Sequence, residues 1–217
     1  MVPVALGAGP AAPLRILCLG AHSDDIEIGC GGTILRLLAE RPGSVVHWAV
    51  FSASPEREIE ARGSARDFLV DAKASTVVVK QFRESFFPAF WTDIKEFFEQ
   101  TKREFNPDLV LCHHRHDFHQ DHRAVAELAW NTFRNHLIFE YEIPKYEGDL
   151  GHPNVLVPLP RVVADRKVEL ILRHFGSQAT RTWFRADTFQ GLMSIRGVEC
   201  NAPEARAEAF HVRKMTI

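Results

Sequence analysis

The sequence predicts an α/β protein with a Rossmann-like, doubly wound, mostly parallel sheet, helices on both faces, and a C-terminal cap of short strands and helices. Three observations predict this class. Short apolar runs alternate with helical patterns through the first 135 residues. The runs are continuously apolar, as in parallel strands that are buried on both faces. The 217 residues, 46% of them hydrophobic, suffice for one compact domain but not for a second full one.

Four apolar runs are predicted to be the strands of this sheet. The first is LRILCLG (14–20), which ends in a polar, glycine-containing segment before the helical pattern TILRLLAE. SVVHWAVF (44–51) precedes the helical REIEARGSARDFLV, and TVVVK (76–80) precedes the helical WTDIKEFFEQTKREF. DLVLC (108–112) follows an Asn-Pro pair. Crossovers between such strands are right-handed, so helices cover both faces of the sheet.

The pattern loosens after residue 135, where we expect a cap built around the strand ends. The segments there are LIFEYEIP, a Gly/Pro-rich GDLGHPNVLVPLP, the helix-like RVVADRKVELILRHF and the basic aromatic TRTWFRADTF. Residues 1–13, MVPVALGAGPAAP, are rich in Gly and Pro and are predicted to be a flexible segment. We assign residues 14–217 to a single domain.

Charge and hydropathy exclude several classes of partner. The formal net charge is -2 and no run of five like charges occurs, which argues against nucleic acid and against an anionic membrane surface. No stretch approaches the roughly 20 apolar residues of a membrane helix, and the start has no positive n-region. We therefore expect a cytoplasmic protein that acts on a small molecule, and a homo-oligomer stays open. The four cysteines are scattered without a CxxC pair, which suits reduced thiols.

The two most polar segments are predicted to meet at one edge of the sheet. If the strand order is 3-2-1-4-5, strands one and four are neighbours where the winding reverses, and ligands bind beyond their carboxyl ends. The segments at those ends are AHSDD (21–25) and HHRHDFHQDH (113–122). The second contains five of the chain's 11 histidines. A histidine cluster beside aspartates indicates a chemical role.

The spacing within these segments predicts a metal site. His22 and Asp25 are three residues apart after a strand, with Asp24 beside them, and His119 and His122 share a face of a helical turn. Imidazole and carboxylate are ligands of zinc, and a catalytic zinc keeps three protein ligands and one position for water. A second His/Asp pair then remains for proton transfer. Taken singly, each residue would more often be a core histidine or a helix cap.

Three further histidines have a less specific pattern. His113, His114 and His116 alternate with Arg115 and precede Asp117, which favours a solvated loop at the rim of the site.

AHSDDIEIGCGGTI together with HQDH resembles the paired motifs AHPDDxExGxGGT and HxDH of the PIG-L or LmbE-like N-deacetylase family. The resemblance extends to Arg57 and Glu60 in REIE, to NPDLV before the fourth strand, and to AEAF (207–210). It implies a zinc-dependent enzyme, with one divalent ion per chain, that removes the acetyl group from an N-acetylated amino sugar or its glycoside. Ser23 stands where the family has proline, which removes a restraint on φ in the metal loop.

The resemblance also implies roles for individual residues. It implies that His22, Asp25 and His122 hold the zinc and that Asp24 is the general base. It further implies that His119 stabilises the oxyanion or protonates the leaving amine. In that scheme Asp121 orients His119.

Arg57 has two interpretations. It opens the helix after the second strand, where its guanidinium could bind sugar hydroxyls, a phosphate or a carboxylate of the substrate. The alternative is a surface salt bridge to Glu56 or Glu60 on its own helix. If Arg57 belongs to that surface, the substrate pocket is expected among Arg83, Glu142 and the segment 181–185.

Two other functions remain as alternatives. Asp24, Asp25 and Glu27 could form the oxygen-rich site of a magnesium-dependent phosphoesterase, although two histidine ligands favour a softer metal. A non-catalytic nucleotide-binding or regulatory module is the second alternative. It is disfavoured because GAHSDD lacks GxGxxG and places carboxylates where a pyrophosphate would lie.

Overall fold

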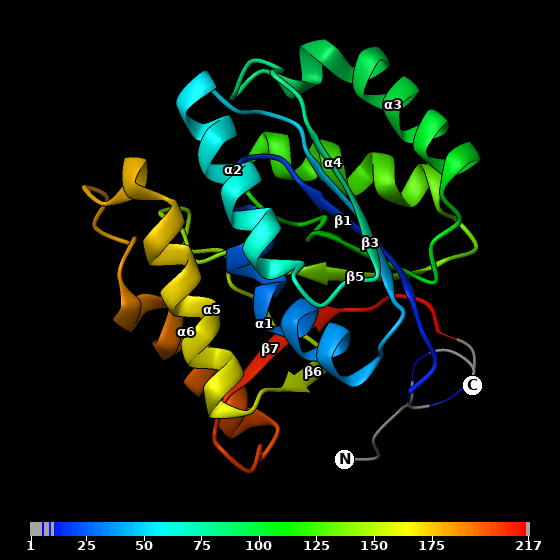
Figure 1. Cartoon of the computed structure of the whole chain (residues 1–217). Helices are drawn as coiled ribbons and strands as arrows, with labels where there is room; N and C mark the ends of the chain where they lie inside the picture. The colour runs from blue at the N-terminus through cyan, green and yellow to red at the C-terminus, as the bar shows by residue number, and fades with distance from the viewer. Residues whose placement is uncertain (1–5, 7–8, 10, 216–217) are drawn as a thin grey trace.

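Seven strands form one sheet in the computed structural model, which describes residues 6, 9 and 11–215 (Figure 1). The strands are β1 (Arg15–Gly20), β2 (Val45–Val50), β3 (Ala74–Val79), β4 (Leu109–His113), β5 (Leu137–Tyr141), β6 (Val155–Pro158) and β7 (Ala207–His211). Their order is β3-β2-β1-β4-β5-β7-β6. The first five strands are parallel, in the order 3-2-1-4-5 on which the expected site depended. β5 lies in the segment LIFEYEIP, which was expected in the cap but pairs parallel with β4. The predicted α/β class is therefore confirmed.

Helices cover both faces of the sheet. They are α1 (Asp25–Glu40), α2 (Pro55–Phe68), α3 (Trp91–Glu104), α4 (Gln120–Thr132), α5 (Arg161–His174) and α6 (Ala186–Glu199), with short 3-10 helices η1 (Phe87–Phe90) and η2 (Gly176–Gln178). Figure 1 shows α3 and α4 on one side of the sheet and α1, α2 and α5 on the other. The strand β1 contributes to both cores: Ile16 and Cys18 pack into one, and Leu17 and Leu19 into the other. This double burial explains the uninterrupted apolar run.

The C-terminal region extends the sheet. β7 pairs antiparallel with both β5 and β6, so the short strands of the predicted cap form the edge of the same sheet. α5 packs on α1 and α2, and α6 packs on β7. The four cysteines are free and buried, as expected for reduced thiols in the core.

Only part of the predicted flexible segment 1–13 is described. Residues 1–5, 7–8 and 10 lie outside the described residues. Of the rest, Leu6 packs against the core beside α1, and the Arg41 guanidinium donates hydrogen bonds to the carbonyl oxygens of Gly9 and Ala12. Among the described residues, no helix has the length and apolar character that a membrane crossing requires.

Candidate functional site

The winding of the sheet reverses between β1 and β4, which are parallel neighbours. At the end of β1 the chain turns sharply, and Asp25 begins α1. The carboxylate of Asp25 accepts a hydrogen bond from the backbone N–H of His22 at 2.6 Å, which fixes the turn. His22, Asp25 and His122 are all buried. His122 comes from the first turn of α4, so the two predicted segments meet as expected.

One nitrogen of each histidine and the two carboxylate oxygens of Asp25 converge. His122 Nε2 lies 3.2 Å from His22 Nδ1 and 3.6 Å from Asp25 Oδ1, and His22 Nδ1 lies 3.4 Å from Asp25 Oδ2. Tetrahedral ligands with bonds of about 2.0–2.1 Å to zinc lie about 3.3 Å from one another. The donor set and its spacing therefore fit a zinc ion.

The second ring nitrogen of each histidine contacts a carboxylate. His22 Nε2 lies 3.3 Å from Asp121 Oδ2, and His122 Nδ1 lies 2.9 Å from Asp117 Oδ2. A carboxylate in this position fixes the tautomer of a metal-binding histidine and raises its basicity. Each histidine thus holds one ring nitrogen against a carboxylate and directs the other toward Asp25.

The Asp121 carboxylate contacts His22, whereas the family resemblance implied that it orients His119. That carboxylate also accepts the backbone N–H groups of Ser85 at 2.6 Å and Phe87 at 3.1 Å. His119 is the N-cap of α4, and its Nδ1 accepts the backbone N–H of Asp121 at 3.2 Å. Because a capping side chain binds backbone N–H groups in the first turn, His119 contacts the main chain of Asp121 rather than its carboxylate.

The rim interpretation is wrong for His113 and Asp117, which are 0% and 3% exposed. His113 is the last residue of β4, one position beyond the predicted strand, and alternation turns it inward. Its Nε2 lies 3.1 Å from Asp25 Oδ2 and accepts the Ala21 backbone N–H at 2.9 Å. Among the described residues, His113 Nδ1 is buried without a partner, and a ligand atom of His113 lies within 4.8 Å of ligand atoms of Asp25 and His122. His116 is exposed, as the rim interpretation predicts.

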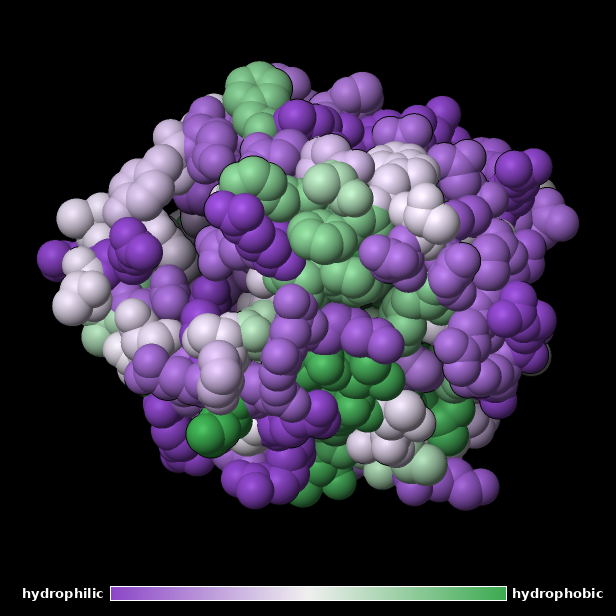
Figure 2. Space-filling model, turned by 90° about the horizontal axis from the view of Figure 1, so that it is seen from above, coloured by the Kyte–Doolittle hydropathy of each residue, from purple (hydrophilic) through white to green (hydrophobic). Residues whose placement is uncertain are grey.

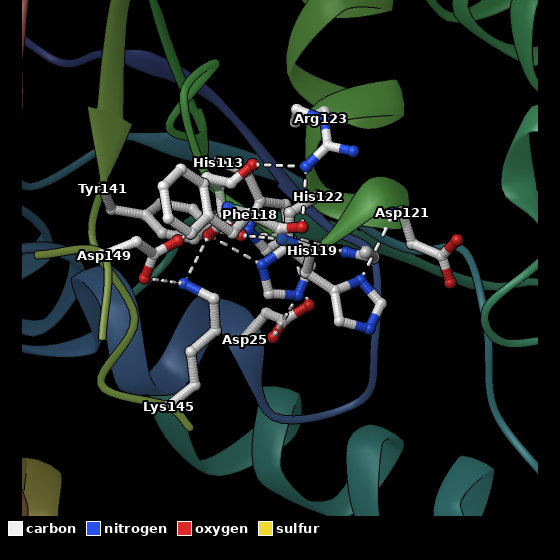
Figure 3. A network of polar contacts seen from close by, with 12 residues as sticks. Asp25, His113, Phe118, His119, Asp121, His122, Arg123, Tyr141, Lys145 and Asp149 are labelled. Carbon is white, nitrogen blue, oxygen red and sulfur yellow. Dashed lines mark hydrogen bonds and ion pairs between the residues drawn. The ribbon is translucent and has the colours of Figure 1, made fainter. Parts of the chain in front are cut away.

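The Asp117 carboxylate contacts three residues around the site. Besides His122, it accepts the backbone N–H of His119 at 2.8 Å and contacts Lys145 Nζ at 3.0 Å. Lys145 also pairs with Asp149, as the dashed lines in Figure 3 show. A buried partner for His122 could have been suspected from the presence of Asp117 five residues before it in the histidine-rich segment.

Arg57 is bound to Asp24 and not to its own helix. Its Nη2 lies 2.8 Å from Asp24 Oδ1, while Glu60 accepts the backbone N–H and the hydroxyl of Ser177. Asp24 precedes α1 but its side chain makes no capping hydrogen bond. Among the described residues, Asp24 Oδ2 and Arg57 Nε are buried without a hydrogen-bond partner. Glu142, an alternative pocket residue, is instead paired with Arg196 at 2.7 Å.

Burial and neighbouring charges shift the pKa values of the site. Burial raises the pKa of Asp24, against the opposing effect of Arg57. Burial would also raise the pKa of Asp25, but the charges of His122, His113 and His22 hold it well below the usual value. The pKa of His22 is raised to about 10, because Asp25 and Asp121 outweigh the effect of burial. Burial and the charge of His113 lower the pKa of His122 to about 3.

One family model matches the chain. The PIG-L model, described as GlcNAc-PI de-N-acetylase, matches residues 17–133, which is more than half of the sequence. The match includes both polar segments of the site. No protein of curated function matches the sequence.

Several solved structures are similar. The conserved protein TT1542 from Thermus thermophilus is 20% identical, with a TM-score of 0.73 over 94% of this chain and 96% of its own. N,N'-diacetylchitobiose deacetylase from Pyrococcus horikoshii is 19% identical, with a TM-score of 0.66 over 92% and 83%. GalB, the 4-carboxy-2-hydroxymuconate hydratase from Pseudomonas putida KT2440, is 16% identical, with a TM-score of 0.71 over 94% and 98%. These likenesses establish a shared fold, and together with the family match over residues 17–133 they lead to one conclusion. The chain belongs to the PIG-L family.

Proposed function

We propose that the protein is a zinc-dependent N-deacetylase that hydrolyses the acetamide of an N-acetylated amino sugar or its glycoside. One observation carries this proposal. Two imidazole nitrogens and a carboxylate converge at 3.2–3.6 Å, with a carboxylate behind each histidine. Membership of the PIG-L family supports the amide chemistry, and one structural neighbour is a deacetylase of N,N'-diacetylchitobiose.

We propose that His22 Nδ1, Asp25 and His122 Nε2 hold the ion. Two nitrogen ligands favour zinc over magnesium, which prefers oxygen. When bound, such an ion polarises a carbonyl oxygen and acidifies water. Because His113 Nε2 already accepts a backbone N–H, we leave His113 out of the ligand set.

Asp24 and His119 are the proposed proton-transfer groups. Asp24 Oδ2 is free to accept a proton, while Arg57 holds Oδ1 and so orients the carboxylate. His119 Nδ1 accepts a backbone N–H, so the neutral ring carries its proton on Nε2. This N–H can donate a hydrogen bond to the amide oxygen as negative charge develops there.

The proposed reaction balances with these groups. Asp24 takes a proton from the water that attacks the amide carbon. His119 stabilises the oxyanion, and the C–N bond then breaks as the leaving nitrogen takes the proton from Asp24. The products are acetate and a free amine.

Arg57 is proposed to bind substrate in addition to orienting Asp24. Its Nε–H is buried beside the site without a partner among the described residues, so one directed donor remains for a substrate hydroxyl.

Acetate release tests the proposal. The metal-loaded protein is incubated with free, nucleotide-linked and thioglycosidic N-acetyl sugars, with chelator-treated protein as the control. Metal-dependent release of acetate supports the proposal. Hydrolysis of a phosphate ester with magnesium, or hydration of a carbon–carbon double bond without acetate release, as the hydratase neighbour would suggest, would overturn it.

A further inference from the structure

Three exposed aromatic side chains lie on the loops that surround the histidine cluster. Phe86 is 43% exposed, Phe118 is 66% exposed and Tyr146 is 68% exposed. They follow β3, β4 and β5, so they share the carboxyl edge of the sheet with the site. We call Phe86, Phe118 and Tyr146 the aromatic rim. Figure 2 shows apolar residues, in green, set among hydrophilic ones on a face that is hollowed at its left side.

Phe86 is held beside the cluster by Asp121. The backbone N–H groups on either side of it, those of Ser85 and Phe87, both bind the carboxylate that contacts His22. The side-chain amide of Gln120 also donates a hydrogen bond to the carbonyl oxygen of Ser85 at 3.1 Å. The Arg83 guanidinium covers one face of the Phe86 ring at 3.8 Å, which leaves the other face for a ligand.

Phe118 and Tyr146 are held by a second set of contacts. The backbone N–H of Phe118 binds Asp149 at 2.6 Å, and Phe118 directly precedes His119. Asp149 pairs with Lys145, whose Nζ lies 3.0 Å from the Asp117 carboxylate that contacts His122 (Figure 3). Tyr146 follows Lys145, and its hydroxyl lies 3.2 Å from Thr182 Oγ1.

The aromatic rim is therefore rigidly placed although its rings face solvent. Each backbone position is connected to a ligand histidine through one or two carboxylates. Exposed apolar side chains that gather at the carboxyl edge of a parallel sheet mark a binding surface, and Phe and Tyr offer large contact areas at low entropic cost. A group that extends from an acetamide at the cluster toward solvent leaves through the carboxyl edge of the sheet, where the rim residues lie.

We infer that the aromatic rim is a subsite for an apolar group attached to the anomeric carbon of the N-acetylated sugar. This inference rests on the proposed function and names the substrate class. The faces of the Phe and Tyr rings would pack against the apolar surface of a planar or alkyl group.

Two exposed carboxylates disfavour a phosphate in the same subsite, against the opposing charge of the Arg83 guanidinium on the Phe86 ring. Glu84 adjoins the Phe86 segment, and its charge acts on His22 and Arg57. Glu147 follows Tyr146, and its charge acts on His119. Both carboxylates are exposed at the rim, where they repel an anionic group.

Paired substrates test the inference. Acetate release is measured from N-acetylglucosamine, its phenyl and octyl β-glycosides, its β-linked disaccharide and its 1-phosphate. The same assay is run on Phe86→Ala, Phe118→Ala and Tyr146→Ala. Ile195→Ala, which removes an exposed apolar side chain from α6, is the control.

We expect the phenyl or octyl glycoside to exceed the free sugar in kcat/KM by about tenfold, the effect of one good aromatic contact. In each rim variant, KM for the glycoside should rise so that kcat/KM falls about tenfold. The kcat/KM for the free sugar should change by no more than about twofold. Phe118→Tyr should restore the preference, and Ile195→Ala should retain it. The phenyl, octyl and disaccharide arms separate an aromatic, an alkyl and a sugar-face contact.

Three results overturn the inference: equal rates for glycoside and free sugar, preference for the 1-phosphate, or rim variants that slow all substrates alike. If no compound releases acetate, the proposed function fails. In that case the affinities of phenyl β-glucosaminide and of glucosamine, both measured by calorimetry, test the aromatic rim separately. Tighter binding of the phenyl compound, lost in the rim variants, supports the subsite, and equal binding overturns it.

Discussion

The two histidines of the cluster offer different ring nitrogens, and the carboxylates behind them explain why. Asp121 contacts Nε2 of His22, whereas Asp117 contacts Nδ1 of His122. Each carboxylate favours a ring proton on its own side, so that the opposite nitrogen is the one a metal ion would bind after displacing any proton there. A charged neighbour thereby selects the tautomer and the orientation of the ring together.

We expect Asp117→Asn to weaken zinc binding tenfold to a hundredfold, roughly the effect of removing such a partner. Competition with a fluorescent chelator measures the affinity directly and needs no substrate. Asp67→Asn is the matched control, since Asp67 binds His174 at the surface between α2 and α5. Unchanged affinity in Asp117→Asn would show that His122 does not need this partner.

A second prediction at the residue scale concerns Asp24. Asp24→Asn preserves the shape of the side chain but removes the proton acceptor, so turnover should fall at least about a hundredfold while zinc remains bound. Metal content by mass spectrometry and acetate release are measured on one preparation. Near-normal turnover by the metal-loaded variant would remove Asp24 from the mechanism.

At the scale of elements, α1 is packed unusually closely. Gly29 faces Tyr141, Gly31 faces Phe68, and Gly32 faces Leu159 and Glu208. Glu208 accepts the backbone N–H groups of Gly32 and Thr33, and Lys167 pairs with Glu208 and binds the carbonyl of Ile28. The glycine-rich motif after the metal loop thus lets strand, helix and buried ion pair approach the helix that begins at Asp25.

Gly29→Ala should destabilise the protein. Its Cβ would lie 2.2 Å from Tyr141 Cδ2, and Tyr141 is fixed by the hydrogen bond of its hydroxyl to the carbonyl of Leu19. Overpacking of this kind costs about 1–3 kcal/mol. Urea denaturation measures it. Gly191→Ala in α6, where no atom lies within 4 Å of the new Cβ, should instead stabilise by about 0.5–1 kcal/mol. Equal effects of the two substitutions would contradict the packing argument.

For the whole molecule, the sequence predicts the parallel half of the sheet well. Each of β1 to β4 is a local apolar run, whereas the order 3-2-1-4-5 was assumed, because right-handed crossovers restrict the possible topologies without selecting one. β7 is less predictable, because it is a short strand that pairs antiparallel with both β5 and β6 and is not placed by a crossover between parallel strands. The side-chain contacts of Asp117 and His113 could not be predicted from the sequence. His113 turns inward because β4 extends one residue beyond the apolar run, and no local signal marks that residue.

Stability of the whole molecule should depend on pH through His211. Burial and the charge of His114 lower the pKa of His211 from 6.5 to about 4. The unfolded chain therefore binds this proton first, and the contribution of neutral His211 is lost as pH falls from about 6.5 to about 4. Unfolding free energies are measured at pH 7.5 and 5.5 on ion-free protein. The difference should be smaller in His211→Asn, and an equal difference would exclude His211 as a source.

The ligand-bearing segments meet across β1 and β4, with His22 and His122 lying 100 residues apart in sequence. A chain emerging from the ribosome presents His22 and Asp25 long before His122 exists. Until β4 joins β1, those two residues form only a partial site, which free zinc in the cell would occupy weakly. At the proposed zinc site, the order of translation would therefore delay metal insertion until the segment that contains His122 has been made.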